Sequence, residues 1–308
     1  MKTLLSAGSF IVFAGLATVA AQVPAVSVSS AYVPQRVYDT RRASFGDFEM
    51  MAADLGRADV VLIGEQHDDS NSHRLELAVL EALARRQVTV TLSLEMFERD
   101  VQASVDAYVS GSSVEDDFLK ASRPWPRYAT DYRPLIEFAR SRHWPVVAAN
   151  VPRRIAADVA KTGKPAIDAL TTQDRSLAAA EVQCPHDTYF DRFAEQMGGG
   201  GHQSGSTPAS ATDTTTERYY WAQCIKDETM AESIASAYAK MGGKPGVIVH
   251  VTGSFHSDYG DGTAERVRRR LAGRRVTVVS MLPVENLDTV APASSDLKRA
   301  DYLVYTIK

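Results

Sequence analysis

The chain has 308 residues, of which 44% are hydrophobic and 23% are charged, and its formal net charge at pH 7 is −4. This length and composition are typical of a globular protein with one large domain or two ordinary ones and enough apolar residues for a buried core. The near balance of 34 basic and 38 acidic residues argues against nucleic acid binding and against a general attraction to anionic membranes.

Residues 1–21 have the pattern of a secretory signal peptide. Lys2 supplies the positive end, Phe10 to Val19 form the apolar core, and Val19-Ala20-Ala21 is a small-residue cleavage site. An N-terminal membrane anchor is the competing interpretation, but the apolar run is short for a bilayer span. No cysteine lies near the cleavage site, so the usual bacterial lipid attachment is not supported. We expect a mature protein without a membrane span, located in a periplasm or secreted.

Apolar runs and helical stripes alternate along the chain after residues 22–36, which lack periodicity and predict a flexible lead-in. A single α/β domain is expected over 37–308. The β-α-β order predicts a mainly parallel central sheet flanked by helices, with right-handed crossovers. The predicted strands are 59–64, 88–94, 145–149, 246–251, 275–281 and an edge strand at 301–306; the predicted helices include 44–55, 71–86, 101–109, one opened by Pro152, 217–241 and 263–271.

Two helical insertions, at about 100–144 and 163–242, predict a helical subdomain or lid inserted into this domain. The first is interrupted at 123–128, where two prolines prevent one continuous helix, and we interpret this segment as a loop near the site. The second contains a Gly/Ser/Thr-rich stretch at 198–216, which predicts a mobile loop.

Two cysteines, Cys184 and Cys224, are present in the whole chain. In an oxidising compartment the simplest expectation is one disulfide, and two separate buried thiols are the alternative. In the chain-entropy model, closing a loop of this length contributes roughly 3 to 5 kcal/mol.

Four strand-like runs each end in polar residues of the types that bind ligands or take part in catalysis. The carboxyl ends of parallel strands lie along one edge of a sheet, and ligands bind in the crevice there. The sequence therefore predicts convergence of side chains that are nearly 200 residues apart: Glu65, His67, Glu95, Arg153, Arg154 and His256.

Two imidazoles and two carboxylates at such an edge allow two kinds of chemistry. They can hold a divalent metal such as zinc or manganese with a position open for water, or they can act without metal as an acid/base group. The candidate ligands are Glu65, His67, Glu95 and His256. His73 is either a further ligand or a solvated helix residue. Arg99, Arg127, Arg153 and Arg154 are candidates for anion capture, because a guanidinium pairs bidentately with carboxylate or phosphate.

Several motifs, in order and spacing over about residues 37–285, resemble the ChaN-like proteins, which belong to a wider group with the Tiki proteases, TraB proteins and erythromycin esterases. The motifs are Ile63-Gly64-Glu65-Gln66-His67-Asp68, Leu94 to Gln102, Ala149-Asn150-Val151-Pro152-Arg153-Arg154, Trp221-Ala222-Gln223-Cys224 with Asp227 to Ala231, and Gly253-Ser254-Phe255-His256. The chain differs from the lipoprotein members in lacking a lipid-bearing cysteine, and its insert at 198–216 interrupts any alignment of haem-contacting residues.

The resemblance implies an exported haem-binding protein associated with iron uptake. It further implies a tyrosine on the haem iron with histidine assistance across a homodimer, for which the candidates are Tyr259, His186 and His202. Arg127, Arg153 or Arg154 would hold the propionates. The alternative function is a metal-dependent or acid/base hydrolase of an ester or amide, in which Arg153 steadies the developing oxyanion beside Glu65, His67, Glu95 and His256.

Overall fold

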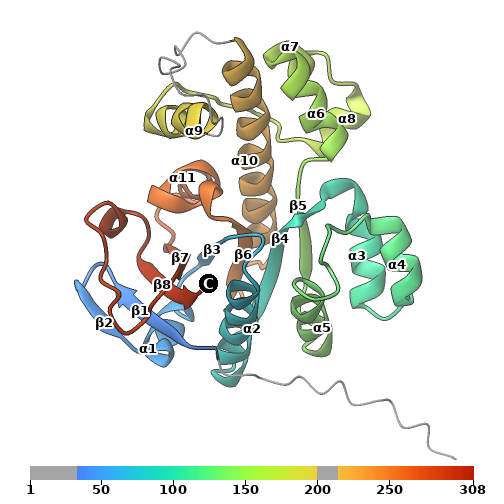
Figure 1. Cartoon of the computed structure of the whole chain (residues 1–308). Helices are drawn as coiled ribbons and strands as arrows, with labels where there is room; N and C mark the ends of the chain where they lie inside the picture. The colour runs from blue at the N-terminus through green and yellow to red at the C-terminus, as the bar shows by residue number, and fades with distance from the viewer. Residues whose placement is uncertain (1–32, 200–213) are drawn as a thin grey trace, which may run out of the picture. The chain divides into compact units, whose positions relative to one another are not determined.

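An eight-stranded, mainly parallel sheet organises the chain in the computed structural model, which describes residues 33–199 and 214–308 (Figure 1). The strand order is β2-β1-β8-β7-β3-β6-β4-β5. The strands are β1 (Gln35–Asp39), β2 (Ser44–Gly46), β3 (Val60–Glu65), β4 (Val90–Glu98), β5 (Val146–Asn150), β6 (Val247–Gly253), β7 (Val276–Val284) and β8 (Tyr302–Ile307).

The six strands from β8 to β5 run parallel, as the β-α-β order predicts. At the other end of the sheet β1 pairs antiparallel with β8, and β2 pairs antiparallel with β1. In the centre, β3 and β6 are nearly continuous apolar runs and are buried along their whole length. Such runs are typical of parallel strands that are covered on both faces.

Helices cover both faces of the sheet, and Val33–Lys308 form one compact unit. The helices are α1 (Phe48–Leu55), α2 (Ser70–Arg85), α3 (Gln102–Val109), α4 (Glu115–Ser122), α5 (Arg133–Ser141), α6 (Arg153–Thr162), α7 (Lys164–Asp168), α8 (Thr172–Leu177), α9 (Thr188–Gly199), α10 (Thr214–Lys240) and α11 (Gly262–Arg270).

Two apolar cores, one on each face, hold these layers together. On one face α1, α2, α3 and α5 pack through residues such as Leu55, Leu83 and Ile136. On the other face α10 and α11 pack through Ile234 and Val267. A fully buried side chain of this size contributes about 1.5 to 3 kcal/mol relative to an exposed one, so these cores fix the sheet against its helices.

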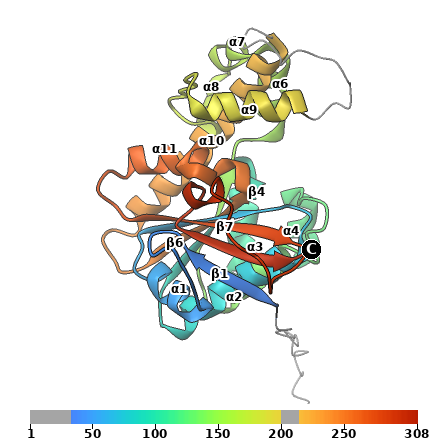
Figure 2. The ribbon, with the colours of Figure 1, turned by 60° about the vertical axis from the view of Figure 1, so that its left-hand side comes forward.

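A helical subdomain, made of α6 to α9 and the first half of α10, lies beyond the carboxyl ends of the strands (Figures 1 and 2). The disulfide between Cys184 and Cys224 ties the segment before α9 to α10, with the two Cα atoms 5.5 Å apart. The predicted pairing of the cysteines is confirmed. A long helix at 217–241 was also expected, and α10 corresponds to it, beginning at Thr214.

The sequence-based prediction differs from the structure in three places. The strand expected at the sheet edge is β8, and it lies inside the sheet because β1 pairs along its free side. The helix expected over 44–55 begins only at Phe48, because the Asp47 side chain accepts a hydrogen bond from the Met50 amide (2.6 Å) and caps the helix there. Strand β1 begins at Gln35, within the segment interpreted as a flexible lead-in. The signal peptide prediction and most of the 198–216 loop lie outside the described residues.

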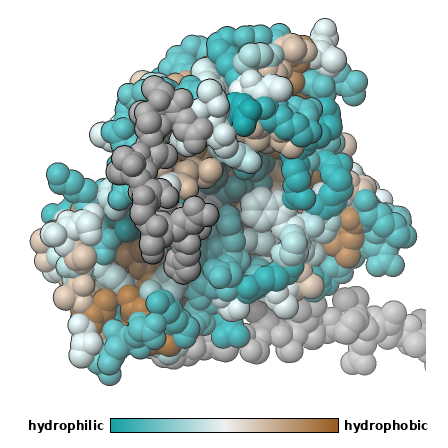
Figure 3. Space-filling model, turned by 45° about the horizontal axis from the view of Figure 1, so that its top comes forward, coloured by the Kyte–Doolittle hydropathy of each residue, from teal (hydrophilic) through white to brown (hydrophobic). Residues whose placement is uncertain are grey.

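None of the helices in the described part of the chain is long and apolar enough to cross a membrane. On the face shown in Figure 3, hydrophilic residues predominate and apolar residues form small separate patches.

Candidate functional site

The carboxyl ends of β3, β4 and β6 bring together the predicted residues Glu65, His67, Glu95 and His256. Glu65 ends β3 and stands in register with Gly253, the last residue of β6. Glu95 lies on β4, on the other side of β6, and its Oε2 accepts hydrogen bonds from the Gly253 amide (2.8 Å) and the Thr252 hydroxyl (2.6 Å). The strand order thus places both carboxylates beside the end of β6.

His256 lies in a buried network with two carboxylates. Its Nδ1 is 2.7 Å from Asp227 Oδ1, and its Nε2 is 3.4 Å from Glu95 Oε1. Asp227, on α10, also accepts hydrogen bonds from the hydroxyls of Thr263 (2.8 Å) and Tyr189 (2.9 Å). Both Asp227 oxygens therefore have donors, and the imidazole is held between two carboxylates.

The two carboxylates determine the charge of His256. Burial lowers the pKa of His256, but Glu95 and Asp227 outweigh burial and raise this pKa to about 10. Burial raises the pKa of each carboxyl, yet His256 holds that of Glu95 well below its usual range and lowers that of Asp227. His256 is therefore an imidazolium at neutral pH, and its charge is balanced by the two carboxylates between which it lies.

His67 faces the same edge from β3, and 46% of its side chain is exposed. Its Nδ1 lies 2.6 Å from Glu65 Oε1, and its ring meets Trp125 edge to face with centroids 5.1 Å apart. Burial lowers the pKa of His67, but the hydrogen bond to Glu65 and the charge of Glu95 raise it overall. A half-exposed imidazole oriented by a buried carboxylate is suited to proton transfer with a bound ligand.

Glycine at position 253 permits the close approach of His67. A Cβ atom there would lie 2.8 Å from His67 Nε2 and 3.8 Å from Glu95 Oε2. Gly64 is equally tight, because its Cβ would lie 2.6 Å from the Ser257 hydroxyl oxygen. Both Gly-x-x-His motifs therefore begin with a glycine that leaves room for the other motif.

A cavity of about 420 Å³ adjoins Glu95 on the side of the helical subdomain. Most of its wall is apolar or aromatic, and its charged residues are two basic and two acidic: Arg153, Lys226, Glu95 and Glu98. Met197 and Tyr219 are exposed by 42% and 44%. The cavity suits a ligand with an apolar body and a few charged groups. It is lined by Glu95, Glu98, Trp125, Asn150, Val151, Arg153, Ala156, Ala157, Ala160, Phe193, Met197, Tyr219, Ala222, Gln223 and Lys226.

The structure separates the predicted anion-binding arginines. Arg153 lines this cavity with 69% of its side chain exposed, and its Nε lies 3.8 Å from Glu98 Oε1. Arg154 pairs instead with Asp174 at 2.5 Å, and Arg127 pairs with Asp131 at 2.6 Å. Arg153 is the one of these three that lines the cavity.

Two of the residues considered as haem ligands, Tyr259 and His186, lie apart from the cavity lining. Tyr259 has a left-handed backbone (φ 62°) and its ring lies against the guanidinium groups of Arg192 and Arg299. His186 pairs with Glu217 at 2.9 Å. His202 lies outside the described residues.

Sequence reasoning gave no role to several residues that complete the site. Asp227 and Gln223 are four residues apart on α10 and share a helix face, and Gln223 Nε2 lies 3.2 Å from His256 Nδ1. Tyr189 and Tyr219 come from the helical subdomain. Asp227 could have been identified from its place in the Asp227 to Ala231 motif. A carboxylate in a motif that accompanies two Gly-x-x-His motifs is a candidate partner for one of their imidazoles.

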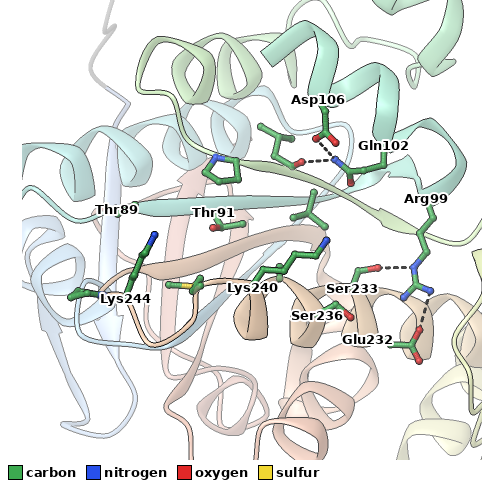
Figure 4. Close-up of a pocket in the computed structure, with 16 residues that line it drawn as sticks. Thr89, Thr91, Arg99, Gln102, Asp106, Glu232, Ser233, Ser236, Lys240 and Lys244 are labelled. Atoms are coloured by element: carbon green, nitrogen blue, oxygen red, sulfur yellow. Dashed lines mark hydrogen bonds and ion pairs between the residues drawn. The ribbon is translucent and has the colours of Figure 1, made fainter. Parts of the chain in front are cut away.

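A second cavity, of about 510 Å³, lies between α10, β4 and β5, and of the candidate residues it contains Arg99 alone (Figure 4). Arg99 there is engaged with Glu232 (3.0 Å) and the Ser233 hydroxyl (2.8 Å). Lys240 and Lys244 also line it. Arg99 therefore has a structural role in binding α10.

With the fold and the site established, comparison with known proteins defines the class. The fold is that of the solved structure described as cofacial heme binding to ChaN of Campylobacter jejuni, with a TM-score of 0.64 at 15% identity over 89% of this chain and 97% of that one. The family described as haem-binding uptake, Tiki superfamily, ChaN matches residues 51–267. The chain belongs to this family.

Two further similarities are more distant. The chain is 25% identical over 240 residues to protein RETICULATA-RELATED 5, chloroplastic, of Arabidopsis thaliana, which covers 74% of this chain and 32% of that protein. The chain thus spans about a third of the length of this curated relative. An erythromycin esterase in its open conformation is similar at a TM-score of 0.45 and 11% identity, over 89% of this chain and 83% of that one.

Proposed function

We propose that this protein binds haem in the cavity beside Glu95 and takes part in haem or iron uptake after export to a periplasm or to the outside of the cell. Membership of the haem-binding uptake family supports this function. The observation that carries it is the chemistry of the cavity, which combines an apolar and aromatic wall with two cationic side chains, Arg153 and Lys226, beside the carboxylates of Glu95 and Glu98. Haem has the matching properties, because an apolar macrocycle carries two propionates.

Tyr219 is the best-placed candidate for a bond to the haem iron. It lines the cavity, 44% of it is exposed, and a tyrosine oxygen is a known iron ligand. Arg153 and Lys226 would pair with the propionates, and Phe193 and Met197 would cover the porphyrin face. The bound iron would bring redox and ligand-binding chemistry of its own, while the chain supplies shape and charge.

A homodimer fits this proposal, because the solved ChaN structure is described as binding haem cofacially. When two haems stack on each other, each has one outer face that protein must cover. In a homodimer, the cavity of each subunit would cover one of these faces. We therefore expect haem and dimer formation to be linked, which light scattering with and without haemin tests directly.

Haemin titration into purified mature protein tests the binding. A shifted, saturable Soret band is expected at one or two equivalents, with weaker binding and an altered spectrum in Tyr219→Phe. Arg153→Ala should weaken binding, whereas Arg154→Ala is a matched control, since Arg154 pairs with Asp174. Tyr259→Phe tests the other tyrosine. An unchanged haemin spectrum with the wild-type protein would contradict the proposal.

A second candidate function is hydrolysis of an ester or amide. The observation that favours it is the convergence of two imidazole–carboxylate pairs, Glu65–His67 and Asp227–His256, near Glu95. His67 would transfer the proton, and Arg153, which lines the cavity, would stabilise the oxyanion. Aryl esters and amides provide a first screen. Full retention of any activity found in His67→Ala would exclude this mechanism.

A further inference from the structure

A second cluster of ionisable side chains lies beneath His67, away from the haem cavity. Glu65 ends β3, while His73 and Glu76 are three residues apart on α2 and face it. His73 Nδ1 lies 3.0 Å from Glu65 Oε2 and 3.3 Å from Glu76 Oε2. All three residues are at most 3% exposed. Among the His, Cys, Asp and Glu side chains of the described residues, these three form a group in which one potential ligand atom from each lies within 4.8 Å of the others.

The carboxylates of this cluster outnumber their donors. Glu65 Oε1 accepts from the hydroxyl of Tyr132 (2.9 Å) and pairs with His67, which leaves its Oε2 facing His73 and Glu76. Glu76 is fully buried, and its Oε1 accepts no hydrogen bond from any residue within 33–199 or 214–308. A buried carboxylate oxygen without a donor is costly. His73 Nδ1 can donate to Glu65 Oε2 or Glu76 Oε2, so a proton on Glu76 or a bound cation would satisfy the oxygen that is left over.

The other nitrogen of His73 is oriented as in metal-binding histidines. His73 Nε2 lies 3.3 Å from the His67 carbonyl oxygen and 3.4 Å from Asp131 Oδ2. A neutral His73 with its single proton on Nε2 donates to one of these acceptors, and its Nδ1 lone pair then points at the two glutamates. A histidine that binds metal commonly donates its second N–H to a carboxylate or a carbonyl in this way. In the absence of a metal, burial lowers the pKa of His73 but Glu65 and Glu76 raise it to about 11, so a metal would take the place of the Nδ1 proton.

We propose that Glu65, His73 and Glu76 bind a divalent transition-metal ion, with Asp131 orienting His73. Two carboxylates and one imidazole suit manganese, iron(II) or zinc better than magnesium or calcium, which prefer oxygen ligands. The ion would hold Glu65 by Oε2 and leave Oε1 to orient His67. The site thus fixes the base of the candidate functional site without contacting a ligand in the cavity, and it does not depend on haem binding.

The competing arrangement has a proton in place of the metal. Burial and the nearby Glu65 raise the pKa of Glu76 well above its usual range, so in the absence of a cation Glu76 is a neutral acid that donates to Glu65. The two arrangements differ in their response to Glu76→Gln. The amide of glutamine can replace the acid as a donor, but it is a poor replacement for a carboxylate as a metal ligand.

The test uses haem-free mature protein stripped with chelator, then titrated separately with MnCl₂ and ZnCl₂. We expect one equivalent of Mn²⁺ or Zn²⁺ to survive desalting, a higher melting temperature with metal, and metal binding about tenfold or more weaker in Glu76→Gln. His67→Ala should still bind metal, since His67 is not a ligand here. Electron spin-echo spectroscopy of the Mn²⁺ form should detect a ¹⁴N coupling from His73.

Two results would overturn the proposal. The first is a wild-type protein that takes up neither ion and keeps its melting temperature, which identifies the proton arrangement. The second is metal uptake that persists in Glu76→Gln but is lost in His67→Ala, which would assign the ion to His67, Glu95 and His256. A ¹⁴N coupling that persists in His67→Ala and is lost in His73→Ala would assign the nitrogen to His73, so the test holds even if Glu76→Gln fails to fold.

Discussion

Two buried histidine–carboxylate networks lie at the same edge of the sheet, and they differ in how their charges are satisfied. Around His256, both oxygens of Asp227 accept hydrogen bonds, and Glu95 accepts two more from β6. Around His73, one oxygen of Glu76 has no donor within the described residues. The first network is complete with the side chains of the chain alone, whereas the second needs an added proton or cation.

This difference separates two roles for histidine in one protein. His256 is fixed as a cation between Glu95 and Asp227, and Glu95 lines the candidate ligand cavity. His73 is buried against Tyr132 and serves to fix the side chains around it. Breaking one network should therefore change the protein differently from breaking the other.

The largest effect is expected from Asp227→Ala, which leaves the His256 imidazolium with one carboxylate and removes the acceptor of Thr263 and Tyr189. Removing one partner of a buried ion pair costs about 3 to 5 kcal/mol. Urea unfolding at neutral pH measures the loss. Asp168→Ala removes an exposed pair with Lys164 and should leave stability unchanged. Equal stability of Asp227→Ala and wild type would show that Asp227 does not hold His256.

Removing the disulfide with Cys184→Ser and Cys224→Ser should act on the His256 network alone. The disulfide closes a loop of 40 residues that carries Tyr189 and Gln223, so its loss should cost about 2 to 4 kcal/mol of stability. Urea unfolding with and without reductant measures this, and reductant should destabilise the wild type but not the double variant. A reductant effect in both proteins would argue against this assignment.

A third buried histidine, His250, provides a reference without a carboxylate partner. Its Nδ1 lies 2.9 Å from the Ser93 hydroxyl, and burial lowers the pKa of His250 to about 4 from 6.5. As the pH falls, His250 takes up its proton near pH 6.5 in the unfolded state but only near pH 4 in the folded state. The stabilisation that comes from a neutral His250 is therefore fully present above about pH 6.5. Between pH 6.5 and pH 4 the free energy of unfolding falls by up to about 1.4 kcal/mol per pH unit. Stability of His250→Asn, measured by unfolding across this range, should show a shallower slope. Superimposable slopes would mean that His250 is not held neutral.

The smallest effect on stability is expected from Gly253→Ala, whose new Cβ would meet His67 Nε2 at 2.8 Å. Because His67 is half exposed, its ring can turn away, and we expect a loss of less than about 1.5 kcal/mol. The ¹H–¹⁵N signals of the His67 imidazole should shift while those of His73 stay in place. A large loss of stability would instead show that the ring cannot move.

Strand-end residues were the part of the site that the sequence predicted well. Apolar runs ending at Glu65, Glu95 and Gly253 defined parallel strands, and parallel strands bring their carboxyl ends together. The prediction needed no knowledge of strand order, because every parallel strand ends at the same edge.

The partners of these residues could not be predicted in the same way. Asp227 lies in the middle of a 27-residue helix, where a carboxylate is ordinarily solvated, and it meets His256 only because α10 crosses the sheet edge. Tyr189 reaches the same point from α9. The position of β8 depends likewise on its pairing with β1, which no local pattern specifies.

The place of β8 also bears on the order of assembly during synthesis. Among the described strands β1 pairs with β2 and β8 alone, so the hairpin of β1 and β2 has no edge to join until β8 has left the ribosome. The nascent chain therefore carries an unpaired β7 edge, open to aggregation or chaperone binding, throughout the synthesis of the segment between β7 and β8.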